Sequence, residues 1–520
     1  MAVDLLPIPL AWVLLGLLVL LLYIYGVRPL STFKKMGVPG PRPWPLIGNV
    51  LDVRHGVYNP DFTLERSQKY GKVYGLYRGA ATPLLVISDR EMLREVFVKQ
   101  FHNFSTRTGE TQFLMTKPLD CMLSTVTGEK WKNLRSTLSP AFSAGKLKKM
   151  SEQLNRCADQ LVSNLGEQTS QGQSFEAKKL TGDFTMDAIA SVGFGTDIDS
   201  QRNPNDPFVV HAKKAFEGPF KNPLFWLFLF FPWIMKPLLE GLGYNFFPRS
   251  TTDFFYKVLD QLMELRQTTV SERLDFMQLM LNAHKEPEEE EEDNSRDVKV
   301  QGQKQALTKD DVVSNGIVFF LAGYDTTATT MAFALYNLAI NQEAQDKVIQ
   351  ELDEVMREKD QVDHEALQQM TYLEMCIMET LRLHPPAALI MTRICTKDTT
   401  IQWLKIPKGM TVLIPVLAIH YDPERWPEPK KFIPERFTAE EREKRDQYDW
   451  LPFGAGPRNC IGMRLAMMEA KIGLAKVFMK YRIKTGPDTD MALKLKKLEP
   501  FPQPVNGIKL RAELRAGGNN

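Results

Sequence analysis

Cysteine is scarce in this chain of 520 residues, which has five and no Cys-x-x-Cys pair. Thiols so few and scattered exclude a disulfide framework and give no sign of a zinc site or a redox dithiol. The net charge is only +2 and no arginine-rich stretch is present, so nucleic acid is not an expected partner. No Gly-x-Gly-x-x-Gly follows a predicted strand and there is no P-loop, so we find no nicotinamide or flavin site of the chain's own. The cysteines are Cys121, Cys157, Cys376, Cys395 and Cys460.

Charge is missing between Leu5 and Val27, a stretch of about 23 residues. As a helix it would be about 35 Å long, enough to cross a bilayer core of about 30 Å, and no small-residue cleavage site follows it. We therefore predict a transmembrane signal anchor over residues 1–28. A buried core helix is the alternative, which Pro7 and Pro9 keep open.

The charges on either side of this stretch predict its orientation. Asp4 precedes it and basic residues follow it, so the positive-inside rule places the rest of the chain in the cytosol, most simply at the endoplasmic reticulum membrane. Residues 29–48 form a basic, proline-rich hinge, in which the prolines between Pro39 and Pro45 predict a stiff, extended spacer. The basic residues are Arg28, Lys34, Lys35 and Arg42.

The remaining chain predicts a body that is mainly helical with small β-sheets. Val73–Gly79 and Leu84–Ser88 are short, rich in β-formers and separated by a turn, which indicates a hairpin. Leu307–Ala339 predicts a long, largely apolar helix through the centre of the body, and Thr308 and Asp311 have the spacing of a capping box at its start.

Two segments depart from this pattern. Pro223–Ile234, with the residue that follows it, is strongly apolar but too short to span a bilayer and is interrupted by prolines. It is either a buried core segment or an aromatic loop that dips into the membrane surface. Glu286–Asp293 is almost entirely acidic and predicts a solvated loop to which we assign no function.

A glycine-rich turn containing Cys460 precedes the last predicted helix, Met463–Lys480. Amide groups and the dipole at a helix N-terminus would lower the pKa of the thiol, as a metal-ligating thiolate requires. We expect Gly456 and Gly462 to adopt positive φ and to allow close backbone approach on either side of the cysteine. Arg458 could reach an anionic group on the ligand that carries the metal. The alternative for Cys460 is a free, buried cysteine in a glycine turn.

The spacing Phe-x-x-Gly-x-Arg-x-Cys-x-Gly, which starts at Phe453, resembles the haem-binding signature of the cytochrome P450 monooxygenases. The resemblance extends over almost the whole chain. It implies the mainly helical fold of that family and a haem b whose iron takes the Cys460 thiolate as axial ligand. At about 150 residues per domain, the length of the chain would suggest roughly three domains. Because motifs spread along the chain serve one haem, residues 49–515 are instead predicted to be one domain.

The central helix carries Ala322-Gly-Tyr-Asp-Thr-Thr, which resembles the oxygen-activation motif of the family. Gly323, Asp325 and Thr326 are mediocre helix formers, and we expect Gly323 to open room beside the helix for dioxygen and water. The resemblance implies that Thr326 and Asp325 are catalytic and deliver protons during oxygen activation. The alternative is that the Thr326 hydroxyl merely bonds to the carbonyl one turn earlier.

Further motifs are similar to those that hold the family's haem and its surroundings. Glu379 and Arg382, at i and i+3 on a helix, with Arg436 in Pro-Glu-Arg-Phe, resemble the family's buried structural ion cluster. The resemblance also implies that several residues bind the haem propionates through charge-assisted bonds. They are Trp131, Arg135, Arg393 and Arg458.

One propionate contact is in doubt, because close relatives place an arginine directly after Asn103. This chain has Phe104 there, with Arg107 a few residues on.

The substrate pocket is expected to be apolar, which indicates lipophilic substrates and nothing finer. Ala322 shares a helix face with two of the other positions that we expect near the haem, Val318 and Thr326. The pocket candidates are Phe113, Leu114, Val318, Leu321, Ala388 and Leu389.

Within the superfamily the chain is similar to the steroid- and drug-oxidising vertebrate family 3, on the stretches that begin at Phe33, Leu138 and Gly456. That resemblance implies electrons from NADPH through a cytochrome reductase, suggests cytochrome b5 as a second donor, and implies substrates such as steroids, fatty acids and xenobiotics. A basic patch could steer an acidic partner, or its members could be ordinary solvated side chains. The patch is Lys130, Lys132, Lys146, Lys148, Lys149 and Arg464.

Two other functions stay open. One is an isomerase that uses the haem on peroxide substrates without external electrons, and the other is a haem sink or sensor without turnover.

Overall fold

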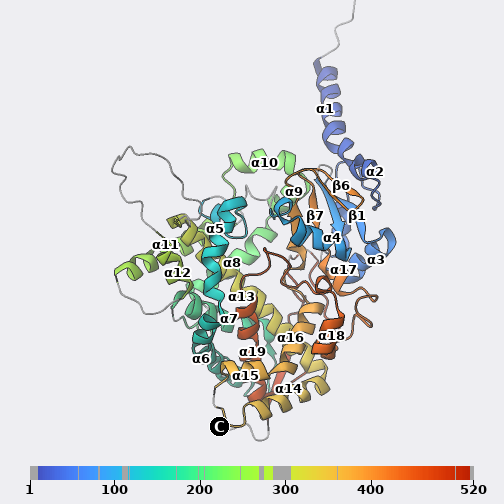
Figure 1. Cartoon of the computed structure of the whole chain (residues 1–520). Coiled ribbons are helices and arrows are strands. Elements are labelled where there is room, and N and C mark those ends of the chain that lie inside the picture. The colour runs from blue at the N-terminus through green and yellow to red at the C-terminus, as the bar shows by residue number, and fades with distance from the viewer. Residues whose placement is uncertain are drawn as a thin grey trace, which may run out of the picture.

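The computed structural model places one long helix outside a mainly helical body with small sheets (Figure 1). It describes residues 10–56, 58–79, 82–107, 115, 117–170, 172–196, 198–203, 205–245, 247–268, 275–284, 306–359, 361–497, 499 and 501–515. The acidic segment 286–293 and the pocket candidates Phe113 and Leu114 lie outside these residues.

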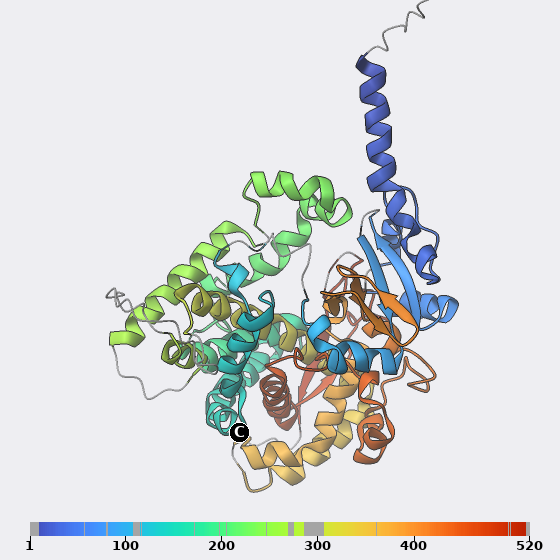
Figure 2. The same ribbon diagram turned by 45° about the horizontal axis from the view of Figure 1, so that its top comes forward.

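Helix α1 (Leu10–Gly26) projects from one end of the body, and both views show it clear of the other elements (Figures 1 and 2). Its side chains are apolar and almost all are exposed, which in water would be unfavourable along its whole length. The helix is long enough, with the short turn after it, to cross a membrane and is consistent with the predicted anchor. A 3₁₀ turn (Arg28–Ser31) and α2 (Thr32–Met36) then lead into the body.

The strands form three small sheets beside the helices. The predicted hairpin is confirmed: β1 (Val73–Arg78) pairs antiparallel with β2 (Thr82–Ile87), with Val73 opposite Ile87. The sheet continues through β7 (Thr411–Leu413), parallel to β2, to β4 (Thr392–Ile394), which carries Arg393. The other strands are β3 (Phe175–Glu176), β5 (Thr399–Ile401), β6 (Leu404–Ile406), β8 (Tyr481–Lys484) and β9 (Lys509–Leu514).

The helices make up most of the body, and the larger hydrophobic core lies among them. A second core packs between the four-stranded sheet and the helices beside it. The helices not described elsewhere are α3 (Pro60–Tyr70), α4 (Arg90–Arg94), α5 (Gly128–Leu138), α6 (Ala144–Thr169), α8 (Pro207–Lys221), α11 (Arg249–Thr268), α12 (Phe276–Asn282), α14 (Gln342–Val355), α15 (His364–Gln369), α17 (Val416–His420) and α18 (Ala439–Lys444).

Helix α13 (Lys309–Ile340) is the predicted central helix. Its capping box is confirmed, since the Thr308 hydroxyl accepts from the Asp311 amide and the Asp311 carboxylate accepts from the Thr308 amide. The helix is apolar enough to cross a membrane, but most of its residues are buried by neighbouring helices. It is therefore the core helix of the body, and α7 (Ala177–Phe194) packs along it.

The apolar segment after residue 222 folds into two short helices, α9 (Pro223–Phe230) and α10 (Pro232–Gly241). Their inward side chains form a small core of their own: Phe225, Phe228, Met235 and Leu239. Leu227, Ile234, Leu238 and Leu242 remain exposed on the outside. These exposed side chains exclude full burial of the segment in the main core, which was one of the two alternatives for it.

Candidate active site

Cys460 lies in a tight loop before α19 (Met463–Lys480), whose bounds are those predicted. The Cys460 amide donates to the Phe453 carbonyl at 2.8 Å and closes the loop. Gly456 has φ of 70°, and a Cβ there would collide with the carbonyl oxygen of Phe97, so both expectations for this glycine are confirmed. The expectation for Gly462 is wrong, because it has φ of −87° and room for a side chain as the residue that caps α19.

Cys460 is exposed to solvent, yet the surrounding chain desolvates its thiol. Burial raises its pKa, and the amides of Gly462 and Met463 together with Arg107 and Arg135 oppose the shift. The amides at the helix N-terminus do lower the pKa of the thiol, but desolvation raises it by more. The prediction of a lowered pKa is therefore wrong for the net shift. The opposing groups are nonetheless those that would stabilise a thiolate once a cation ligates it.

Buried arginines gather next to this loop. Arg393 is fully buried, and burial, with Arg107 and Arg458 beside it, lowers its pKa well below its usual range. Burial, with Arg107 and Arg135 beside it, lowers the pKa of Arg458 to about 9. Within the described chain, Arg393 Nε and Nη2, Arg107 Nε and Arg458 Nε have no hydrogen-bond partner.

Three cations that are buried together without a carboxylate are costly, unless an anion joins them. A haem fits this donor set, because its two propionates supply that charge next to a thiol able to ligate iron.

The residues predicted beside the propionates are distributed around this cluster. The guanidinium of Arg458 stacks on Trp131, with Cζ 4.4 Å from the ring centroid. Arg135 donates to Asn459, at 3.0 Å to its carbonyl and 2.9 Å to Oδ1, and so braces the cysteine loop. Arg107 donates to the Arg458 carbonyl and joins the cluster. Sequence reasoning left Arg107 out of the site because it lies three positions away from the expected arginine.

In the middle of α13, Ala322 is exposed although most of the helix around it is buried. The Thr326 hydroxyl donates to the Ala322 carbonyl at 2.8 Å, which is the alternative considered for it. Asp325 is buried and pairs with Lys178 of α7 at 3.0 Å. Gly323 does not open a groove as expected, because a Cβ there would lie 2.9 Å from Ile189 of α7. This glycine lets the two helices pack closely.

The predicted ion cluster is assembled below these helices. Glu379 and Arg382 of α16 (Thr371–Leu383) are fully buried and form two parallel bonds, of 2.7 and 2.8 Å. Arg436, in the 3₁₀ turn Pro434–Phe437, lies 3.3 Å from Glu379 Oε1 without hydrogen-bond geometry. Arg382 also donates to the carbonyl of His420 at 2.7 Å. The cluster therefore joins three separate segments.

The described pocket candidates lie on two elements. Val318 and Leu321 are on α13, while Ala388 and Leu389 lie in the 3₁₀ turn Ala388–Ile390, just before β4. Leu321 and Ala388 are buried and the other two are partly buried.

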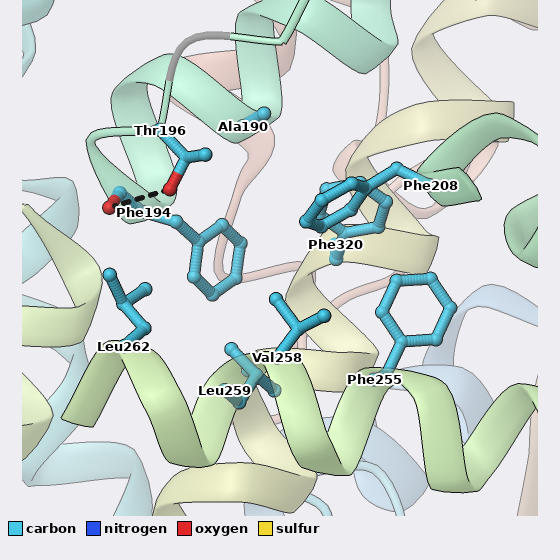
Figure 3. A pocket seen from close by; sticks show the side chains of 10 residues that line it. Ala190, Phe194, Thr196, Phe208, Phe255, Val258, Leu259, Leu262 and Phe320 are labelled. Atoms are coloured by element: carbon cyan, nitrogen blue, oxygen red, sulfur yellow. Dashed lines mark hydrogen bonds between the residues drawn. The ribbon is translucent and has the colours of Figure 1, made fainter. Parts of the chain in front are cut away.

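A separate cavity of about 20 Å³ lies between α7, α8, α11 and α13, lined by residues such as Phe194, Phe208, Phe255 and Phe320 (Figure 3). It has room for little more than one small molecule such as water, and its apolar wall favours an empty state, so it is not a substrate site.

Comparisons with known proteins agree with this architecture. The family model described as Cytochrome P450 matches residues 38–511. Cytochrome P450 3A27 of Oncorhynchus mykiss is 38% identical over 506 residues, which cover 97% of this chain and 94% of that protein. Cytochrome P450 3A29 of Sus scrofa is 38% identical over 97% of both chains, and Cytochrome P450 3A41 of Mus musculus is 39% identical over 96% of both.

The chain therefore belongs to the cytochrome P450 family of haem-thiolate monooxygenases. Within that family it is similar to the 3A members over nearly its full length.

Proposed function

We propose that this monooxygenase inserts one oxygen atom of O₂ into lipophilic substrates such as steroids, fatty acids and xenobiotics, at the endoplasmic reticulum membrane. The observation that carries the proposal is the buried arginine cluster next to Cys460, which has no counter-charge within the described chain. The apolar helix α1 supports the membrane location, with the body in the cytosol.

The residues around Cys460 hold the haem in this proposal. Cys460 would supply the thiolate that ligates the iron, and Arg393, Arg458 and Arg107 would bind the propionates, while Trp131 supports Arg458 by stacking against its guanidinium. Arg135 fixes the loop that carries the thiolate, and Phe453 closes it through its carbonyl. When bound, the haem supplies the activation of O₂, which the thiolate assists by donating electron density.

The chain's own contribution to oxygen activation would be the handling of protons by Asp325 and Thr326 of α13. The Thr326 hydroxyl, now bonded to the Ala322 carbonyl, can turn about one side-chain torsion to donate away from the helix. The Asp325 carboxylate renews the proton that Thr326 passes on. Val318, Leu321, Ala388 and Leu389 supply apolar contacts that orient a lipophilic substrate and exclude water.

Electrons come from NADPH through a cytochrome reductase, with cytochrome b5 as a possible second donor. Lys146, Lys148 and Lys149 at the start of α6 support a docking surface for an acidic partner, since they stand close together and two of them are exposed. Lys130 and Lys132 contribute less, because they pair with Asp311 at 2.8 Å and Glu129 at 2.6 Å.

Turnover with purified reductase tests this function. The chain in lipid vesicles is given NADPH, reductase and a panel of steroids and fatty acids, and hydroxylated product is measured together with NADPH consumed. We expect product that depends on both reductase and O₂. Turnover of a peroxide substrate without reductase would instead support the isomerase, and the absence of any product with any class of lipophilic substrate would favour a haem sink.

A further inference from the structure

One face of α7 carries three polar side chains that reach the part of α13 holding Asp325 and Thr326. Lys178, Thr181 and Thr185 follow one another at spacings of three and four, so they share a face of the helix. α7 lies along α13, and their labels stand next to each other at the centre of the body in Figure 1. None of the three belongs to a motif that the sequence analysis singled out.

The two threonines tie the helices together through fully buried hydroxyls. Thr181 Oγ1 is 2.9 Å from the Ala328 carbonyl, and Thr185 Oγ1 is 2.9 Å from the Tyr324 carbonyl one turn earlier. Each hydroxyl has a second acceptor in its own helix, the carbonyl of Ala177 at 2.9 Å or of Gly182 at 3.1 Å.

Neither helix needs these bonds to satisfy its backbone, because interior carbonyls already accept from the amide four residues on. What the bonds add is a lateral attachment of the 324–328 turn to α7.

Lys178 extends the same attachment to the carboxylate. Its ammonium lies 3.0 Å from Asp325 Oδ1, and the lysine side chain is 24% exposed, so it joins a buried acid to the surface of the body. Asp325 Oδ2 is buried and has no hydrogen-bond partner among the residues that the structure describes. One oxygen of Asp325 is therefore held by a cation, and the other is left for a water or a hydroxyl.

We propose that Lys178, Thr181 and Thr185 are positioning residues for oxygen activation, which form a strap that holds Asp325 and the 324–328 turn of α13 in place. This inference rests on the proposed function. The Lys178 ammonium fixes Oδ1. The carboxylate takes up a proton from water at Oδ2, passes it on towards Thr326 and returns to its charged form, so no net charge is left on the pair after each cycle. Without the strap, Asp325 loses its counter-charge and the 324–328 turn moves more freely. Proton delivery through Thr326 is then misdirected, and electrons from NADPH are lost as hydrogen peroxide.

Hydrogen exchange of the α13 amides in haem-loaded protein, without reductase, tests the threonine part independently of turnover. In Thr185→Val and Thr181→Val, exchange of the peptide over residues 321–331 should rise about fivefold, as loss of one net hydrogen bond allows. Thr185→Ser should restore it. Thr169→Val is the matched control, because this buried hydroxyl bonds only within its own helix, to the Leu165 carbonyl at 2.7 Å.

The coupling of NADPH to product tests Lys178. Lys178→Met should lower product per NADPH about threefold or more and raise peroxide to match, consistent with a partly buried ion pair, and Lys178→Arg should restore most of the coupling. Lys179→Met is the control, since the next lysine pairs with Asp183 at 3.5 Å instead.

Unchanged coupling in Lys178→Met, or unchanged exchange in both threonine-to-valine variants, overturns the strap. If these valine variants do not fold, the comparison of Lys178→Met with Lys178→Arg, at a partly buried position, decides alone. Failure of the proposed function itself looks different: the wild-type chain then shows no reductase-dependent product, while the exchange comparison still reports on the attachment.

Discussion

Two groups of buried arginines in this chain differ in whether a carboxylate lies beside them. Arg382 forms a bidentate pair with Glu379, and Arg436 stands 3.3 Å from the same carboxylate, so protein groups balance part of their charge. Arg393 and Arg458 meet no such group in the described chain. We therefore propose a structural role for the first group and, for the second, a role that a bound anion completes.

Glu379→Ala should abolish haem-loaded protein. The substitution leaves two buried guanidiniums without their carboxylate, which costs about 3–5 kcal/mol, and it opens the junction between α16 and the Pro434–Phe437 turn. Haem content per mole of purified protein is the measurement.

The neighbouring acid gives a matched control for this variant. Glu435 lies one residue from Arg436, but it pairs with the exposed Lys347, a kind of contact worth about 0–1 kcal/mol. Glu435→Ala should load haem like the wild type. Normal haem content in Glu379→Ala would contradict the structural role of the cluster.

At the scale of elements, local signals in the sequence predict helix ends well. The capping box at Thr308 and the bounds of α19 follow from side chains within one helical turn of the helix end. The β1–β2 hairpin follows from two short runs of β-forming residues with a turn between them. Contacts between distant elements leave no such signal. The packing of Ile189 against Gly323 and the Lys178–Asp325 pair depend on how α7 lies on α13, and spacing along either helix does not encode it.

The same limit applies to the candidate site. The motif residues could be predicted because their order and spacing resemble those of a known family, whereas Arg107 could not, because a loop brings it to the cluster from an unexpected position. The directions of pKa shifts also need the fold, since burial around Cys460 outweighs the local effect of the helix N-terminus.

Helices α9 and α10 present an apolar outer face at the end of the body from which α1 projects (Figures 1 and 2). Replacement of Leu227, Ile234 and Leu238 by serine should weaken the binding of protein lacking residues 1–28 to lipid vesicles by about tenfold or more, because each buried leucine-sized side chain contributes about 1.5–3 kcal/mol. Co-sedimentation with vesicles measures the binding.

Leu514→Ser is the control for this triple variant, because Leu514 is as exposed but lies at the end of β9, near the C-terminal end of the chain. Equal vesicle binding by the triple variant and by the otherwise unchanged protein lacking residues 1–28 would show that α9 and α10 do not contact the membrane.

At the scale of the whole molecule, one site draws on segments spread over more than 300 positions. Trp131, Arg393 and Arg458 meet near Cys460, and α13 and α19 run through the same core. For this reason we propose that residues 49–515 form one folding unit around one cofactor, with residues 1–28 as its anchor and 29–48 as the hinge between them.

The absorption spectrum of the reduced, carbon-monoxide-bound protein tests the central claim most directly, since it reports which atom ligates the iron opposite the gas. The wild-type chain should show the Soret band of a thiolate-ligated haem. Cys460→Ser should lose that band while the protein stays in the membrane fraction, and Cys395→Ser, which changes a different cysteine that is buried, should keep it. A wild-type band at the position of histidine-ligated haem, or a thiolate band that survives in Cys460→Ser, would contradict the account.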